Sequence, residues 1–373
     1  MKRANTRTGV FTFLLALGTA AMSFIAGAAQ AAPASAVSQP DQVQMGAASG
    51  PCSVMARQMP NPAMPSQPIH VFVPAGPGKT PLTGDRCNSA HRPAVVISHG
   101  FGAITPDAYK GLIEHLVSVG NIVVFPVYPL GTNTKQFEDS YRRFDAGVVA
   151  ALAATRADTS RLGFWGHSFG GGMVPYLVRQ AGARGWGGRG LWMSMVAQAY
   201  SQLVGKGAID VPRNTQAMTL AFDDDNMADA RLGIDVYSSL TIPAAQKRHI
   251  TVRTDTHGQQ ALVADHLTPA SVGNGLIDAY DFLLYRYADQ LQGCAIGRTS
   301  CDVDWSTVGT WSDGRPLSPA RVTDHPVDVG PAPALVADCD GGLAGGPPVA
   351  TIGDQTILGG INPRWEKCGP TRR

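Results

Sequence analysis

The residues best suited to chemistry gather around Ser168, at the centre of the run Gly-His-Ser-Phe-Gly over 166–170. In the Gly-x-Ser-x-Gly pattern the serine lies on a sharp turn between a buried strand and a helix, and small flanking residues let the chain turn without a clash. Residues 158–165 read as a turn leading into a short apolar strand, and 173–179 resume a helical apolar spacing. This context predicts a nucleophilic serine.

A serine hydroxyl is a weak nucleophile at neutral pH, so a base must take its proton and an acid must hold that base in the right tautomer. On a strand–turn–helix scaffold the order along the chain is serine, acid, histidine. Three consecutive aspartates follow a predicted strand. We favour Asp225 as the acid, because it lies far enough beyond the strand's end to turn back toward the serine, and we keep Asp223 and Asp224 as alternatives.

The base should follow the last strand of the sheet. His257 lies on the loop directly after the strand expected at 249–253, and we favour it as the base. His266, later on the same loop, is the alternative if that loop is long. His249 begins the strand and would lie at the wrong end of the sheet, so we expect it to have a structural role.

Negative charge on a substrate oxygen would need two backbone donors. One is the N–H of Phe169, directly after the nucleophile. The other is the N–H of Phe101, within the run Ser-His-Gly-Phe-Gly after the first buried strand, whose glycines give the loop its freedom. We expect His99 to brace this loop. His167, beside the serine, is expected to pack at the cleft rather than to take part in the chemistry.

The elements around these residues follow a β/α rhythm. Strands are expected at 68–74, 94–98, 121–127, 191–197, 217–222 and 249–253, and helices at 108–118, 140–156 and 271–291. Short apolar strands separated by helical segments predict an α/β fold with a mostly parallel sheet covered by helices on both faces. The stretch between 197 and 217 is too short for a large lid.

The amino terminus carries signs of export. Lys2, Arg3 and Arg7 precede an apolar run at 10–29 and a small-x-small site at 29–31, as in a signal peptide over 1–31. A retained membrane anchor is the alternative. No later stretch is long and apolar enough to span a bilayer, so we expect a secreted protein, extracellular or periplasmic, without stable membrane insertion after cleavage.

Composition divides the rest of the chain into three parts. Residues 32–66 read as a flexible leader, 67–292 as the catalytic domain, and 293–373 as a Gly-, Pro- and Cys-rich extension that wraps that domain. All six cysteines follow residue 31, and an even count in an exported chain predicts disulfides. Their pairing is open in principle. We expect these pairs: Cys52–Cys87, Cys294–Cys301 and Cys339–Cys368.

Charge and cysteine spacing argue against several other classes of protein. The chain has a net charge of +2. Removing the three basic residues of the signal peptide leaves about −1, and the basic residues form no run, so we expect no nucleic-acid partner. The sequence contains no Cys-x-x-Cys pair, which argues against a zinc or redox site.

The motifs together resemble the α/β-hydrolase superfamily. They are His-Gly-Phe-Gly at 99–102, Asp158-x-x-Arg161 leading into the run around Ser168, and then Asp225 and His257. Within the superfamily the sequence is most similar to bacterial cutinases and related polyester hydrolases, with dienelactone hydrolases next. The resemblance covers about residues 68–291.

This resemblance implies carboxylic ester hydrolysis through an acyl-enzyme, without metal or organic cofactor. It also implies that Phe101 is an aromatic of the cleft and that Tyr200 is a second one. Two features depart from the cutinase pattern, namely Phe169 in place of Met and the cysteine-rich tail. Both leave the identity of the substrate open.

The sequence thus predicts a secreted serine esterase of the α/β-hydrolase fold, monomeric, with an open cleft for small or polymeric esters. Ser168 would attack the ester, His257 would move the proton and Asp225 would orient the imidazole. The alternatives are acyl transfer or amide hydrolysis on the same triad, and a non-catalytic binding protein on the same scaffold. The tail beyond 293 could also act as a removable cap.

Overall fold

The computed structural model describes residues 36–76, 87, 91–129, 134–270, 277–327, 350–352, 355–357 and 364. The chain divides into two units, Met1–Ala36 and Val37–Arg373, and the fold below is that of the second. The predicted signal peptide lies outside the described residues. No described helix is long and apolar enough to cross a membrane.

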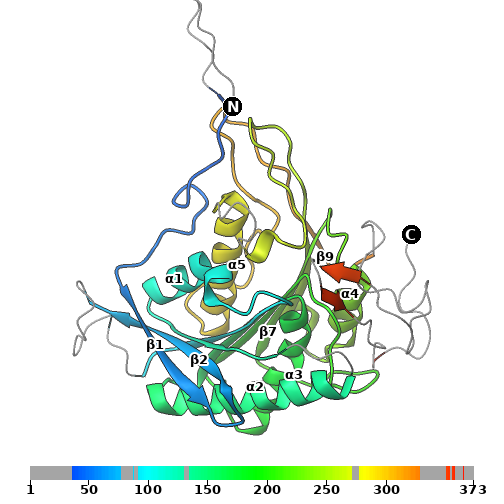
Figure 1. Cartoon of the computed structure of the whole chain (residues 1–373). Helices are drawn as coiled ribbons and strands as arrows, with labels where there is room; N and C mark the ends of the chain where they lie inside the picture. Colours follow the sequence, from blue (N-terminus) through cyan, green and yellow to red (C-terminus); the bar gives the residue numbers. More distant parts are fainter. Residues whose placement is uncertain are drawn as a thin grey trace, which may run out of the picture. The chain divides into compact units, whose positions relative to one another are not determined.

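A nine-stranded sheet forms the centre of the second unit (Figure 1). Its strands are β1 (Ser53–Asn61), β2 (Met64–Ala75), β3 (Ala94–Ser98), β4 (Ile122–Pro126), β5 (Arg161–His167), β6 (Gly190–Val196), β7 (Thr215–Phe222), β8 (Lys247–Val252) and β9 (Arg321–Thr323). They lie in the order β1-β2-β4-β3-β5-β6-β7-β8-β9. The six strands from β4 to β8 in this order are parallel, whereas β1, β2 and β9 are antiparallel to their neighbours. The predicted α/β class with a mostly parallel sheet is confirmed.

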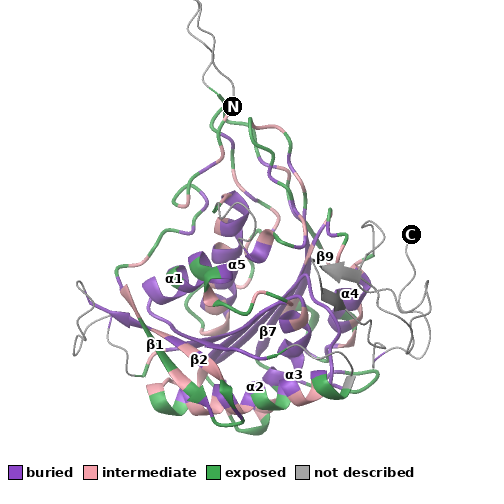
Figure 2. Ribbon diagram, viewed as in Figure 1, coloured by how far each residue is buried: buried purple, intermediate pink, exposed green. Residues whose placement is uncertain are grey.

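Helices cover both faces of this sheet. On one face lie α1 (Lys110–Ser118) and α5 (Ala279–Ala295); on the other lie α2 (Thr134–Thr155), α3 (Phe169–Ala183) and α4 (Ala230–Ser239). In Figure 1, α1 and α5 are above the strands and α2 and α3 below them. In β3, Val95 and Ile97 pack toward α1 and α5, whereas Ala94 and Val96 pack toward α2 and α3. Burial on both faces explains the continuous apolar runs, and Figure 2 shows the central strands buried along their length.

Several elements of the second unit were not expected from the sequence. The strand β1 lies within the stretch interpreted as a flexible leader and pairs antiparallel with β2 from Ser53↔Ala75 onward. It is an edge strand with exposed positions, so its sequence lacks the apolar run of a central strand. The helix α4 and the strand β9 were also missed.

The last helix begins later than expected. We predicted a start near 271, but α5 begins at Ala279, and 271–276 lie outside the described residues. Asp278 sets the start, because its side chain accepts hydrogen bonds from the N–H groups of Tyr280 and Asp281 while the Asp281 side chain accepts from the Asp278 N–H. This capping box is a strong start signal for a helix.

The first part of the C-terminal extension packs on the main domain. Trp305, Val308 and Trp311 join the core beside α5, and β9 adds an edge to β8. Farther on, β10 (Ala350–Ile352) and β11 (Gln355–Ile357) form a separate antiparallel pair. The described residues of the extension up to 327 thus pack beside α5 and against the edge strand β8.

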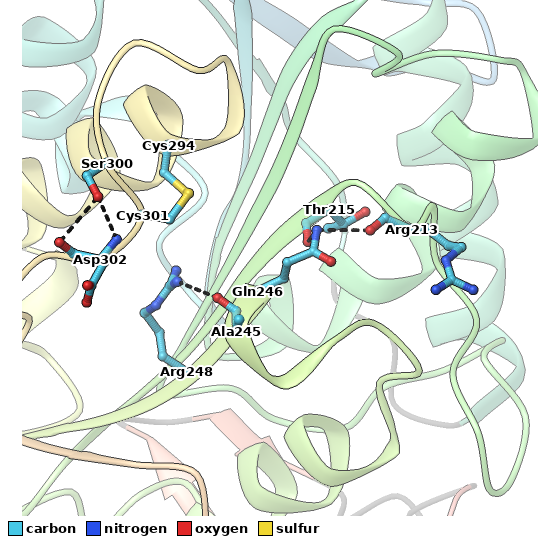
Figure 3. The surroundings of a disulfide bond; sticks show 9 residues. All are labelled: Arg213, Thr215, Ala245, Gln246, Arg248, Cys294, Ser300, Cys301 and Asp302. Carbon is cyan, nitrogen blue, oxygen red and sulfur yellow. Dashed lines mark hydrogen bonds between the residues drawn. A yellow bond between two sulfur atoms is a disulfide. The ribbon is translucent and has the colours of Figure 1, made fainter.

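Two of the three expected disulfides are present. Cys52 bonds to Cys87, and Cys294 near the end of α5 bonds to Cys301. Figure 3 shows the second bridge with the side chain of Arg248, from β8, directed toward it. The Arg248 guanidinium stacks over the ring of Trp305 at 4.4 Å. The third expected pair, Cys339–Cys368, lies outside the described residues.

Candidate active site

Ser168 lies on a tight turn between β5 and α3. Its φ of 56° is in the left-handed region, which an L-residue adopts only when its surroundings hold it there. Here the Ser168 N–H donates to the Val196 carbonyl at 2.9 Å. The Ser168 carbonyl accepts from the N–H groups of Gly172 at 3.0 Å and Ala199 at 2.9 Å. Main-chain groups of α3 and of the segment at the end of β6 therefore fix the turn, as the sequence pattern predicted.

The glycines on either side of the serine are required by space. A Cβ atom at Gly166 would lie 2.3 Å from the Gly170 carbonyl oxygen, and one at Gly170 would lie 2.0 Å from the Ser98 carbonyl oxygen. Both contacts are with backbone, which cannot move aside. The close approach of β3, β5 and α3 at this point thus depends on residues without a side chain.

A line of hydrogen bonds joins Ser168 to a histidine and an aspartate. The His266 Nε2 atom lies 3.0 Å from Ser168 Oγ, and its Nδ1 atom lies 2.9 Å from Asp225 Oδ2. All three residues are buried, with 5–8% of each exposed. Because a carboxylate only accepts, Nδ1 carries the ring proton and Nε2 is left to accept from the serine hydroxyl. This is the tautomer in which an imidazole can take a proton from Ser168.

Asp225 is held in place by the turn that follows β7. Its Oδ1 atom accepts from the N–H groups of Met227 at 2.8 Å and Ala228 at 2.9 Å, which leaves Oδ2 to face His266. The carboxylate is thus oriented from one side by main chain and from the other by the imidazole. The choice of Asp225 as the acid agrees with this geometry.

The two neighbouring aspartates bind a different partner. Asp223 Oδ1 accepts from the Thr254 N–H at 2.9 Å, and Asp224 Oδ2 accepts from the Thr254 hydroxyl at 2.5 Å. Both therefore tie the end of β7 to the segment after β8. The three aspartates divide into one residue that meets the histidine and two that hold adjacent loops together.

The choice of His257 as the base is corrected by the structure. Its Nε2 atom donates to Asp313 Oδ2 at 2.7 Å, and its Nδ1 atom accepts from Arg315 Nη1 at 3.1 Å, so both ring nitrogens are engaged away from Ser168. The reason lies in the loop. Asp255 and Leu262 pair antiparallel through N–H···O bonds of 2.9 and 2.8 Å, so the segment between them projects as a turn. The chain returns to the end of β7 at Ala264, whose carbonyl accepts from the Asp224 N–H at 3.0 Å, two residues before His266.

His167, which precedes the serine, is buried and contacts the loop that carries His266. Its Nε2–H donates to the carbonyl of His266 at 2.9 Å, and its Nδ1 accepts from the Tyr109 hydroxyl at 3.0 Å. Burial lowers the pKa of His167 well below its usual value, which keeps the ring neutral. His167 also lines the cavity beside Ser168, as expected.

His99 braces the loop after β3, as predicted. Its ring stacks on Tyr128 with centroids 4.0 Å apart, and its Nε2 accepts from the Tyr128 N–H at 3.3 Å. The Tyr128 hydroxyl donates to the His99 carbonyl at 2.5 Å. Burial lowers the pKa of His99 to about 4. His249 is likewise buried and structural, with its Nδ1 atom 2.8 Å from Thr219 Oγ1 and its pKa lowered by burial to about 4.

A cavity of about 260 Å³ opens beside the Ser168 hydroxyl. It is lined by Phe101, Gly102, Ala103, His167, Ser168, Phe169, Met227, His266, Leu267 and Ala270. The rings of Phe101 and Phe169 lie 6.0 Å apart at its wall, and Phe137 from α2 stacks behind Phe169 at 5.2 Å. Most of the lining is apolar, which suits the hydrocarbon part of a ligand.

Tyr200 does not line this cavity, contrary to our expectation. It is 3% exposed and packs with Leu232 against Phe169. The Tyr200 carbonyl accepts from the Tyr141 hydroxyl at 2.9 Å, and a Cβ atom at Gly172 would lie 1.9 Å from it. Because the segment around Tyr200 packs closely against α3, Tyr200 lies behind Phe169 and does not reach the cavity.

The two residues expected to supply oxyanion donors both border the cavity next to Ser168. Phe169 is the first residue of α3, so its N–H has no partner within the helix, and the positive end of the helix dipole lies there. Phe101 lies in the loop that follows β3. Their position is compatible with binding a negatively charged oxygen, and that role stays a prediction.

Several residues of the site were not expected from the sequence: Ala103, Leu267 and Ala270 of the cavity lining, and also Met227 and Tyr109. Met227 lines the cavity and donates its N–H to Asp225, and its place two residues after the acid could have suggested it. Tyr109 lies at the end of the short 3-10 helix η2 (Pro106–Tyr109) and hydrogen-bonds to His167. Nothing in the sequence around Tyr109 pointed to the site.

Among the residues that the structure describes, no group of three or more His, Cys, Asp and Glu side chains could hold a metal ion. Neither a scan against protein-family models nor a search of curated proteins finds a match to this chain.

Proposed function

We propose that the chain is a serine hydrolase of carboxylic esters that forms an acyl-enzyme on Ser168. The observation that carries this proposal is the line Ser168–His266–Asp225, with contacts of 3.0 and 2.9 Å, at the wall of an apolar cavity. A hydroxyl, a neutral imidazole and a carboxylate in this order are the parts that nucleophilic acyl transfer needs.

The first half of the reaction would use each member of this line once. Ser168 Oγ attacks the carbonyl carbon of the ester while His266 Nε2 takes the hydroxyl proton. Asp225 stabilises the imidazolium that results, through its bond to Nδ1. When the carbon–oxygen bond of the ester breaks, His266 returns the proton to the leaving alcohol, and the acyl group stays on Ser168.

The second half repeats these steps with water. His266 removes a proton from the water as it attacks the acyl carbonyl, and then protonates Ser168 as the acid departs. In both halves the carbonyl oxygen becomes negative. The N–H groups of Phe101 and Phe169 are the donors that we assign to it, with the N-terminus of α3 adding its dipole.

The topology supports assignment of the domain to the α/β-hydrolase fold. The nucleophile follows β5 on a sharp turn into α3, the aspartate follows β7 and the histidine follows β8. Serine, acid and histidine come in this chain order in that fold, on turns at one edge of a parallel sheet. The mostly apolar side chains that line the cavity support the proposal that the acyl group of the substrate binds there.

Export is part of the same proposal. The two disulfides, Cys52–Cys87 and Cys294–Cys301, fit an extracellular protein, because disulfides persist where the surroundings are oxidising. We therefore propose a secreted esterase whose substrate is a small or polymeric ester outside the cell.

The test is hydrolysis of a p-nitrophenyl ester series from acetate to palmitate by the wild type and by Ser168→Ala. We expect kcat to fall by about 10⁴-fold or more in the variant, since removing the nucleophile leaves only binding and the oxyanion donors. The acyl length that is best hydrolysed measures the cavity. Equal rates for the two proteins would contradict the proposal.

A further inference from the structure

One series of hydrogen bonds links the connection between β3 and α1, the end of β5 and the segment after β8. It begins at the Gly100 N–H, which donates to the Tyr109 hydroxyl oxygen at 2.8 Å. It continues from Tyr109 to His167 Nδ1 at 3.0 Å and from His167 Nε2 to the His266 carbonyl at 2.9 Å. The series thus runs from the loop that holds Phe101, through the residue before the nucleophile, to the main chain of the base.

The direction of every bond in this series is fixed by its two ends. The Gly100 N–H can only donate, so the Tyr109 oxygen accepts from it and its own proton is available to His167 Nδ1. The His266 carbonyl can only accept, so the ring proton of His167 lies on Nε2. A neutral His167 therefore satisfies both neighbours with a single tautomer.

Burial makes this arrangement costly to disturb. Tyr109 is 1% exposed, His167 is 3% exposed, and the Tyr109 ring also packs edge-on against Trp165 at 5.6 Å. Gly100 lies so close that a Cβ atom there would be 2.9 Å from His167 Nδ1. An unmade hydrogen bond in such a place costs more than one at the surface, because water cannot replace the lost partner.

Resting on the proposed function, we propose that His167 is a positioning residue that, with Tyr109, sets the distance between the oxyanion loop and the main chain of His266. Asp225 orients the imidazole of His266 from the side-chain end. His167 holds the same residue from its carbonyl end and ties it to the Gly100 segment. The base and the oxyanion donor are thereby kept in register with Ser168, to which His167 is directly bonded along the chain.

The experiment measures kcat and KM for the preferred p-nitrophenyl ester in Tyr109→Phe, His167→Ala, His167→Gln and the double variant Tyr109→Phe/His167→Ala. Misplacing a reacting group by about 1 Å can cost about 100-fold in rate. We expect His167→Ala and Tyr109→Phe each to lower kcat by about 10- to 100-fold, with KM changed by less than about twofold.

Two results separate positioning from general support of the fold. His167→Gln should recover about fivefold or more of the kcat lost in His167→Ala, because its amide N–H can reach the place of Nε2–H. The double variant should be about as active as His167→Ala alone, because both changes interrupt the same series of hydrogen bonds. Should His167→Ala fail to fold, Tyr109→Phe and His167→Gln still carry the test.

Tyr287→Phe and His115→Gln are the matched controls. Tyr287 is a buried tyrosine that donates to the Trp305 carbonyl at 2.7 Å, and His115 is a buried histidine whose Nε2 lies 2.8 Å from Asp289. Both lie outside this series of hydrogen bonds, so we expect kcat within about twofold of the wild type.

The possible failures are distinct. If Ser168→Ala abolishes hydrolysis while folded His167→Ala keeps the wild-type kcat, the positioning role is wrong and the proposed function stands. The positioning role is also overturned if the losses of kcat add up in the double variant, or if the variants raise KM without lowering kcat. If the wild type shows no hydrolysis that depends on Ser168, both proposals fail.

Discussion

Two histidines on the segment that follows β8 each meet an aspartate from another part of the chain, at almost the same distance. His266 meets Asp225 at 2.9 Å, and His257 meets Asp313 at 2.7 Å. What differs is the partner of the other ring nitrogen. In His266 that nitrogen faces the Ser168 hydroxyl, whereas in His257 it faces the Arg315 guanidinium. A short contact between histidine and aspartate is therefore no evidence of a site by itself.

The second partner decides what each imidazole can do. A hydroxyl has a proton to give, so His266 can act as a base toward Ser168. A guanidinium is always charged and only donates, so it occupies the lone pair with which His257 would accept a proton. The surroundings differ in the same sense. The side chain of His257 is 22% exposed and that of His266 is 6% exposed, so electrostatic interactions are less screened around His266.

The largest expected effect comes from replacing the two histidines in turn. We expect His266→Ala to lower kcat for a p-nitrophenyl ester by about 10⁴-fold, because it removes the base that activates Ser168. We expect His257→Ala to stay within about twofold of the wild type. Steady-state kinetics on both folded variants make the comparison. A large loss in His257→Ala would reverse our correction of the base.

The acids should separate in the same way, with a somewhat smaller effect. Asp225→Asn presents an amide N–H to His266 and favours the wrong tautomer, so we expect kcat to fall by about 10³- to 10⁴-fold with little change in fold. Asp313→Asn is the matched control and should retain the wild-type kcat. Circular dichroism checks that both variants are folded, and equal kcat values in the two would break the comparison.

Burial should also appear in the dependence of stability on pH. Burial lowers the pKa of His99 and of His249 to about 4, below the value of about 6.5 in an unfolded chain. Between pH 6.5 and 4 the folded state therefore binds fewer protons than the unfolded state. Stability is full above pH 6.5 and falls as the pH drops, by about 1.4 kcal/mol per pH unit for each histidine.

Urea unfolding at several values between pH 7 and pH 4.5 measures this slope. The lowered pKa of His167 acts in the same direction. We expect His249→Gln to reduce the slope by about one proton, because one buried imidazole no longer titrates on unfolding. A free energy of unfolding that stays constant from pH 7 to pH 4.5 would show that these imidazoles are not buried neutral.

The smallest effect is expected at His257 and Asp313, the more exposed of the two histidine–aspartate pairs. Arg315→Ala removes the guanidinium from His257 Nδ1, but this side chain is exposed and the partners are partly so. We expect Tm to drop by no more than a few degrees and kcat to be unchanged, because exposed charged contacts add little stability. Differential scanning fluorimetry with and without added salt checks this. A loss of activity would link this pair to the site.

The sequence predicted those parts of the site that depend on local pattern. Ser168 was found because a strand, a turn between glycines and a helix must follow one another in the chain, and β3 was placed correctly from its continuous apolar run. Asp225 was chosen because the apolar pattern of β7 shows where that strand ends, and the acid of a serine–acid–histidine set is expected just beyond it. Each of these inferences needs only a few neighbouring residues.

The parts that were missed depend on contacts between distant segments. His257 seemed better placed than His266 because it comes first after β8. Only the pairing of Asp255 with Leu262 shows that the residues between them, His257 included, project away from Ser168 as a turn. The role of Tyr109 depends on a contact with His167, far along the chain. The strand β1 was missed for a similar reason, since its pairing with β2 compensates for a weak apolar pattern.

The most direct measurement is the rate at which a fluorophosphonate probe labels Ser168, followed by mass spectrometry of the labelled peptide. Such a probe reacts with a serine that a neighbouring base activates. We predict that the wild type and His257→Ala are labelled at the same rate and that His266→Ala is labelled at least about 10³-fold more slowly. Unchanged labelling in His266→Ala, or labelling that stops in His257→Ala, would contradict the assignment of Ser168, His266 and Asp225 as the active site.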